Sequence, residues 1–178
     1  MKSTRAAGRY SKALIELALE RNALEQIKTD ALVVLNAIEN SKDLRNLLAS
    51  PIVKPAQKQN LLSQIFDKHV SELTSLFIAL IVKQGRDQVL EQIFTAVMND
   101  YREHMNILEA TFTTSTTVPA STLASIKQKL EHATGKTVEI TSHVDPKLIG
   151  GYIVDMKNYR LDASLAGGMK KLKRELSK

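Results

Sequence analysis

Residues 107–118, ILEATFTTSTTV, mark the point at which the sequence changes from one secondary-structure pattern to another. Residues 110–118 are rich in β-branched side chains, which favour a β-strand. From residue 4 to about residue 106, apolar residues recur at three- and four-residue steps, the spacing of amphipathic helices. We therefore expect a helical half and an α/β half that meet near residues 105–108.

The N-terminal half predicts about six helices, and hence a six-helix bundle over residues 1–106. Pro55 suits the first turn of a helix, because its missing N–H would have no hydrogen-bond partner there. The breaks between helices are expected at residues 39–41, 50–55 and 67–71 and at Gly85.

Residues 107–178 predict a small α/β domain after the bundle. A helix is expected from about residue 119 to residue 133 and a strand over residues 136–144. A short hairpin is expected from residues 151–156 and 159–161, with its turn around Lys157 and Asn158. Ser164 can cap a final helix that runs to Leu176. The predicted fold class is mainly α, with an N-terminal six-helix bundle followed by a small α/β C-terminal domain.

The residues that carry catalysis in other proteins are absent or scattered here. The 178 residues include no cysteine, which excludes thiolate metal sites and cysteine nucleophiles. The four histidines are not spaced to share a helix face, so no metal site is predicted. Gly150–Gly151 fits neither a phosphate-binding loop nor a dinucleotide-binding motif. We expect no catalytic residue, no cofactor, no metal and no appreciable binding of nucleotide.

The longest uninterrupted apolar run, Leu76–Val82, has seven residues. A membrane-spanning helix needs about 20, so no direct membrane span is expected. The first residues lead into a mixed helical pattern without the apolar stretch of a secretory signal. We therefore expect a protein that stays inside the cell, with no signal or transit peptide.

The net charge of +6 is concentrated at the two ends of the chain. Residues 1–12 hold four basic side chains and no acid, and residues 157–178 hold seven basic side chains against two acids. Such ends suit a basic nucleic-acid-binding adaptor, contact with an anionic membrane surface or, more simply, a solvated surface. The basic residues lack interleaved aromatic rings on which bases would stack, which argues against the adaptor.

Two segments of the helical half carry more apolar surface than a small bundle needs. On a helix over residues 6–21 the apolar arc spans about 240°, against the roughly 100° that one-sided packing requires. The run Leu76–Val82 is apolar on every face. Such helices are either central in the bundle or covered by a partner. Two of them in about 100 residues favour a groove that binds an amphipathic helix.

Five sequence segments, in order along nearly the whole chain, resemble the delta subunit family of bacterial and chloroplast ATP synthase, which is equivalent to the mitochondrial oligomycin-sensitivity-conferring subunit. Four residues depart from the family pattern: Ala163, where the family usually has glycine, Asp87, where an apolar residue is common, and Gly167 and Gly168, which fall early in the last helix. The matching segments are residues 6–14 (AAGRYSKAL), 47–51 (LLASP) with Lys58 and Leu61–Leu62, 83–86 (KQGR), 144–151 (VDPKLIGG) and 161–164 (LDAS).

The resemblance implies a non-catalytic stator subunit of a proton-translocating F-type ATP synthase, which links the catalytic head to the peripheral stalk. Residues 1–106 would bind the N-terminal helix of an alpha subunit, and residues 107–178 would contact the b, or b and b′, subunits of the stalk. The protein would lie peripheral to the inner membrane, on its cytoplasmic side, and bind no nucleic acid. The groove for the alpha-subunit helix would be lined by Tyr10, Ala13, Leu14, Leu17, Leu76, Ala79 and Lys83.

Overall fold

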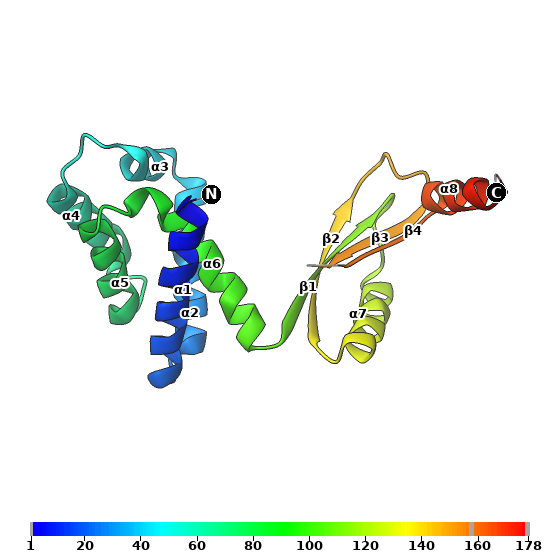
Figure 1. The fold of residues 1–178 in the computed structure, drawn as a ribbon, viewed down its shortest axis with the longest axis horizontal. Coiled ribbons are helices and arrows are strands. Elements are labelled where there is room, and N and C mark those ends of the chain that lie inside the picture. The colour runs from blue at the N-terminus through cyan, green and yellow to red at the C-terminus, as the bar shows by residue number, and fades with distance from the viewer. Residues whose placement is uncertain (1, 157–158, 177–178) are drawn as a thin grey trace. The chain divides into compact units, whose positions relative to one another are not determined.

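The computed structural model describes the backbone of residues 2–156 and 159–176, and the side chains among them except at residues 2–4, 120, 170–172 and 176. The chain divides into two compact units, residues 1–102 and residues 103–178. The described residues form mainly helices with one small sheet, which confirms the predicted fold class (Figure 1). The turn predicted at Lys157 and Asn158 lies outside the described residues.

The first unit is a bundle of helices, as predicted. A one-turn 3-10 helix, Asp87–Val89, precedes the last of them. The α-helices are α1 (Lys2–Glu20), α2 (Leu24–Asn40), α3 (Lys42–Ala49), α4 (Pro55–Phe66), α5 (Glu72–Lys83) and α6 (Leu90–His104). Apolar side chains from α1, α2, α4, α5 and α6 fill its core, with Leu14, Ile27, Phe66, Ile81 and Phe94 among the most buried.

Local sequence explains where several of these helices begin and end. Pro55 stands in the first turn of α4, as predicted. Ser71 precedes α5, and its hydroxyl accepts a hydrogen bond from the backbone N–H of Thr74. Gly85 ends the α5 segment with a φ of 64°, a left-handed conformation that glycine adopts without steric cost.

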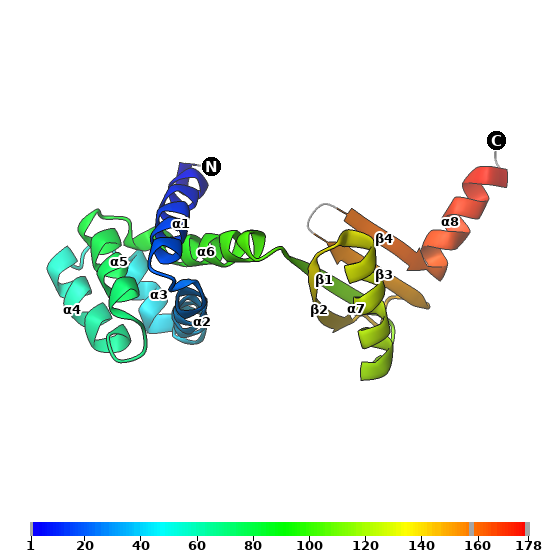
Figure 2. The ribbon, with the colours of Figure 1, turned by 90° about the horizontal axis from the view of Figure 1, so that it is seen from below.

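The second unit contains a four-stranded sheet with strand order β2-β1-β3-β4. β1 pairs with β2 in parallel, while β1–β3 and β3–β4 are antiparallel. A parallel pair needs a crossover, which α7 provides; Figure 2 shows this helix against the sheet. The elements are β1 (Ile107–Thr114), α7 (Ala120–Thr134), β2 (Thr137–Val144), β3 (Gly151–Met156), β4 (Tyr159–Ser164) and α8 (Leu165–Leu176).

A small apolar core holds α7 on this sheet. Ala110 and Phe112 of β1, Val138 of β2 and Val154 of β3 are buried together. Leu123, Ile126 and Leu130 of α7 pack against them. Since side chains alternate along a strand, the opposite sheet face carries residues such as Thr111 and Thr113 and is largely polar.

The strand expected over residues 110–118 lies earlier, at residues 107–114. Its pairing with both neighbours ends at Thr114, opposite Val144 and Tyr152. The Thr114 hydroxyl then donates to the carbonyl of Thr116 at 2.7 Å, which closes a turn. The β-branched residues beyond Thr114 therefore have strand propensity but no strand to pair with.

The start of α8 is capped by Ser164, as predicted. Its hydroxyl oxygen accepts the backbone N–H of Gly167 at 3.0 Å. Asp162 Oδ1 in turn accepts the backbone N–H of Ser164 at 3.0 Å and its hydroxyl at 2.6 Å. A Cβ atom at Gly167 would lie 2.7 Å from this carboxylate, so glycine gives Asp162 room beside the helix start.

Limited proteolysis should cleave between the two units before either unfolds. Met105 and Asn106, which connect α6 to β1, are exposed, and exposed connections between compact units are the first sites of cleavage. A stable helical fragment of roughly 105 residues should accumulate, as measured by mass spectrometry and circular dichroism. Early cleavage confined to residues 10–85 would contradict the division into two stable domains.

Candidate partner-binding surface

Helix α1 is buried on one side only. Ala7, Ser11, Leu14, Ile15 and Ala18 are buried, and Leu14 is only 1% exposed. The remaining apolar residues on the adjoining side recur at four-, three- and four-residue steps, so they form one stripe along the helix. This stripe consists of Ala6, Tyr10 and Leu17, which are half-buried, and Ala13, which is exposed.

Helix α5 also keeps apolar side chains in solvent. Phe77, Ile78, Ile81 and Val82 are buried, whereas Leu76 is 61% exposed and Leu80 is 46% exposed. Leu73 is half-buried on the same side as Leu80, seven residues earlier. The run Leu76–Val82, which is apolar on every face, therefore has one side in the core and the other side exposed.

The two helices meet at a pair of aromatic rings. Tyr10 and Phe77 lie edge to face with ring centroids 6.5 Å apart. Phe77 packs in the same manner on Phe94 of α6, at 6.1 Å, which anchors the pair to the core. At about 100° per residue, Leu73 and Leu80 lie on the side of α5 nearest Phe77, and hence nearest α1. We call this surface the α1/α5 strip: Ala6, Tyr10, Ala13 and Leu17 with Leu73, Leu76 and Leu80.

A pocket of about 180 Å³ lies on the other side of α5, against α4. Its apolar lining includes Leu62 and Phe66 of α4 and Leu76, Ile78 and Ala79 of α5. Leu76 therefore stands between the pocket and the α1/α5 strip. Ala79 faces α4 rather than α1.

The structure brings together only some of the residues predicted to line a groove. Tyr10, Ala13, Leu17 and Leu76 belong to the α1/α5 strip, and Lys83 is exposed at the end of α5. Leu14 lies in the core and Ala79 in the α4–α5 pocket. Sequence reasoning missed Leu73, Phe77 and Leu80. Phe77 and Leu80 lie within the apolar run Leu76–Val82, and Leu73 precedes that run, beyond Thr74 and Ser75.

A buried carboxylate fixes the start of α5. Asp30 of α2 is fully buried, and its Oδ2 accepts the Ser71 backbone N–H at 2.9 Å, the Ser71 hydroxyl at 2.5 Å and the Thr74 hydroxyl at 2.6 Å. The side-chain amide of Gln26 donates to Oδ1 at 3.0 Å. Because a helix N-terminus favours negative charge, the first turn of α5 stabilises this anion.

A second buried polar pair fixes the segment that follows α5. Lys58 of α4 and Asp87 are both buried and form an ion pair. Lys58 Nζ also donates to the carbonyl of Leu48 in α3, at 3.2 Å. Asp87, where the family commonly has an apolar residue, thus ties the α5–α6 connection to α3 and α4. Asp30 and Asp87 together hold both ends of α5, so its exposed face is presented on a rigid support.

The second unit exposes apolar side chains along β4 and in the first half of α8. Tyr159 and Leu161 on β4, and Leu165 and Met169 on α8, are all about half exposed or more. The basic residues Lys173 and Arg174 follow in the last turns of α8. This surface is amphipathic, and we call it the β4/α8 surface.

Within residues 2–156 and 159–176, no helix is long and apolar enough to cross a bilayer. The same residues include no group of three or more His, Cys, Asp or Glu side chains placed to hold a metal ion. What the structure does present is uncovered apolar surface on rigid helices. Exposed apolar surface of this kind is typical of protein–protein contact sites.

Comparisons with known proteins identify the family. The family model of the ATP synthase delta (OSCP) subunit matches residues 6–176. The ATP synthase subunit delta of Christiangramia forsetii is 31% identical over 176 residues, which cover 99% of this chain and 95% of that protein. The ATP synthase subunit delta of Carboxydothermus hydrogenoformans is 32% identical, with 99% of both chains covered. The chain belongs to the ATP synthase delta (OSCP) subunit family.

A solved structure shares the fold over nearly the whole chain. One chain of the cryo-EM structure of the Toxoplasma gondii mitochondrial ATP synthase hexamer superposes with a TM-score of 0.75 at 21% identity, covering 97% of each chain. Family and fold together make this protein a non-catalytic stator subunit of an F-type ATP synthase, as the sequence predicted. They favour this role over that of a nucleic-acid-binding adaptor.

Proposed function

We propose that the first unit binds the N-terminal helix of an alpha subunit on its α1/α5 strip. The observation that carries this proposal is the uncovered apolar surface on either side of the Tyr10–Phe77 contact. An amphipathic helix laid between α1 and α5 would cover Leu76 and Leu80, which otherwise remain in water. Small Ala6 and Ala13 on the α1 side would let the backbone of that helix approach closely.

The second unit supplies the other attachment of the stator. We propose that its β4/α8 surface binds the b, or b and b′, subunits of the peripheral stalk. Exposed Leu161, Leu165 and Met169 provide the apolar area for such a contact. One chain that binds the head through one unit and the stalk through the other would stop the head from turning with the rotor. We place it on the cytoplasmic side of the membrane, peripheral to the bilayer.

Ala13→Asp should weaken binding of a synthetic alpha-subunit N-terminal peptide roughly a hundredfold, because the carboxylate would be buried without a partner on binding. Ala13 is exposed in the free protein, so the variant should fold normally. Isothermal titration calorimetry measures the affinity, and circular dichroism checks the fold. Lys83→Ala, at the end of α5, should cost much less and mainly change the salt dependence.

Two further variants locate the binding surface. Ala56→Asp, exposed in the first turn of α4, introduces the same charge outside the strip and should bind like wild type. Ala79→Asp places the charge in the α4–α5 pocket. If Ala79→Asp lost more peptide affinity than Ala13→Asp, the helix would bind in that pocket rather than on the α1/α5 strip. A folded Ala13→Asp protein with wild-type affinity would show that the α1/α5 strip does not bind the helix.

A further inference from the structure

Most charged residues around the α1/α5 strip are separated by sign along its length; Lys12, midway along α1, is a further basic residue between the two groups. Arg5 and Arg9, in the first half of α1, are exposed, as are Lys83 and Arg86 at and just after the end of α5. The acidic residues are at the opposite ends of the same two helices: Glu16 and Glu20 late in α1, and Glu72 in the first turn of α5, all exposed.

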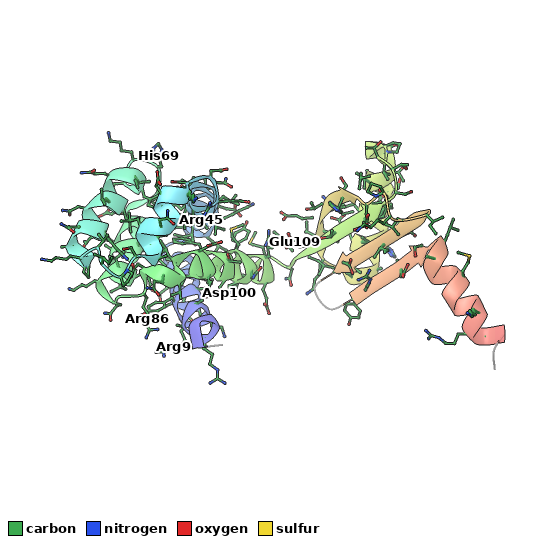
Figure 3. The ribbon with its side chains drawn as sticks, turned by 90° about the horizontal axis from the view of Figure 1, so that it is seen from above. Arg9, Arg45, His69, Arg86, Asp100 and Glu109 are labelled. Atoms are coloured by element: carbon green, nitrogen blue, oxygen red, sulfur yellow. The ribbon has the colours of Figure 1, made fainter. Side chains whose placement is uncertain are left out.

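The direction of the helices places like charges together. Figures 1 and 2 show α1 and α5 running in opposite directions, so the start of α1 lies beside the end of α5. Figure 3 shows Arg9 and Arg86 at the same end of the bundle. One end of the strip therefore carries Arg5, Arg9, Lys83 and Arg86. The other carries Glu16, Glu20 and Glu72, with Arg21 from the turn after α1 and Lys68 from the loop before α5 as opposing charges.

We infer that the strip binds an amphipathic helix in one orientation, with the acidic turn of that helix over the Arg9–Lys83–Arg86 end and its basic turn over the Glu16–Glu20–Glu72 end. This inference rests on the proposed function, since it orients the helix proposed to bind there. The reverse orientation would set acid against acid and base against base. Such like-charge contacts discriminate between binding modes more than they change the affinity of the favoured one.

The charge order also fixes the chain direction of the bound helix. Acidic side chains are favoured in the first turn of a helix and basic ones in the last, so a typical amphipathic helix starts acidic and ends basic. Its N-terminus would then lie at the basic end of the strip, and the helix would run parallel to α1 and antiparallel to α5. The dipole of the bound helix opposes this direction, but it amounts to about half a charge at each end, which is less than the net charge of the side chains beside either end of the strip.

The absence of cysteine from the 178 residues allows the orientation to be measured directly. Single cysteines are introduced by Gln84→Cys, beside Lys83, or by Lys68→Cys, in the loop before α5; both native residues are exposed. Each variant carries a nitroxide spin label and is mixed with an isotope-labelled alpha-subunit N-terminal peptide. The label at position 84 should broaden the NMR signals of the peptide's first turns, and the label at position 68 those of its last turns.

Charge reversal provides a second, independent readout. Arg9→Glu combined with Lys83→Glu should weaken peptide binding about tenfold at low salt and much less at high salt. A peptide whose acidic and basic residues are exchanged should bind this double variant better than it binds wild type. Lys42→Glu combined with Lys129→Glu makes the same change in net charge on α3 and α7, outside the strip, and should leave the affinity unchanged.

The outcomes separate this inference from the proposed function. If the wild-type protein does not bind the peptide, the proposed function fails. If it binds, but the broadening pattern is reversed or the same with both labels, the orientation is wrong while the binding site stands. Equal effects of the two double reversals would likewise overturn the orientation. The expected pattern of broadening, with rescue by the charge-exchanged peptide, supports it.

Discussion

Asp30→Ala should lower the free energy of unfolding by about 3–5 kcal/mol. The Asp30 carboxylate is fully buried and accepts hydrogen bonds from Gln26, Ser71 and Thr74. Alanine would leave the buried Thr74 hydroxyl and the half-buried N–H and hydroxyl of Ser71 without this acceptor, and would remove the anion from the start of α5. Urea denaturation followed by circular dichroism measures the change.

Two matched variants test this explanation. Asp30→Asn keeps the size of the side chain and part of its accepting capacity, so it should lose less stability than Asp30→Ala. Glu39→Ala removes a carboxylate that is exposed near the end of the same helix and should change stability by less than about 0.5 kcal/mol. If Asp30→Ala were no worse than Glu39→Ala, the buried network would not contribute to the fold.

The functional consequence of Asp30 concerns α5. The first turn of α5 is held to α2 through Ser71 and Thr74, and the exposed residues Leu76 and Leu80 follow within two turns. A folded Asp30→Asn protein should therefore bind the alpha-subunit peptide somewhat more weakly than wild type, although Asp30 itself cannot touch the peptide. The buried network holds the start of α5, and the binding surface includes the exposed face of the same helix.

The sequence predicted elements well where local chemistry decides them. Pro55 marks the first turn of α4, Gly85 ends α5, and Ser164 caps α8, because each residue acts on its own backbone neighbourhood. The β1 strand was misplaced because a strand ends where its partners end, and the partners of Thr114 lie 30 and 38 residues further along the chain, at Val144 and Tyr152.

The binding surface was harder to predict because burial depends on the whole bundle. On α1 the apolar arc was correctly identified, but nothing local shows that Leu14 faces the core while Ala13 faces solvent. On α5 the run Leu76–Val82 has no polar residue to mark the outer side. Contact between Tyr10 and Phe77 identifies that side, and it requires the fold.

The buried carboxylates were missed for a related reason. Asp30 lies three residues after Ile27 and four before Val34, so its register on α2 is that of the buried face. That spacing was the available signal. Asp87 had no such signal: it follows a turn, and its partner Lys58 is 29 residues earlier in the sequence.

Asp87→Ala should also destabilise the first unit by about 3–5 kcal/mol, because it leaves the Lys58 ammonium buried and without its counter-ion. Within the described part of the chain, the carbonyl of Leu48 would remain as its acceptor. Denaturation in urea again measures the change.

Replacing both partners gives the decisive comparison. Lys58→Met combined with Asp87→Leu exchanges the ion pair for apolar groups of similar size, and such replacements of buried pairs are often neutral or stabilising. The double variant should therefore regain most of the free energy of unfolding that Asp87→Ala loses relative to wild type.

The same double variant also tests whether the ion pair is needed to position the basic end of the strip, because Asp87 is close in sequence to Lys83 and Arg86. Peptide affinity close to wild type is expected, because the packing of α4 on the α5–α6 connection would be retained without the charges. Two results would contradict this explanation of how α4 is joined to the α5–α6 connection. One is an Asp87→Ala protein as stable as wild type; the other is a double variant less stable than both wild type and Asp87→Ala.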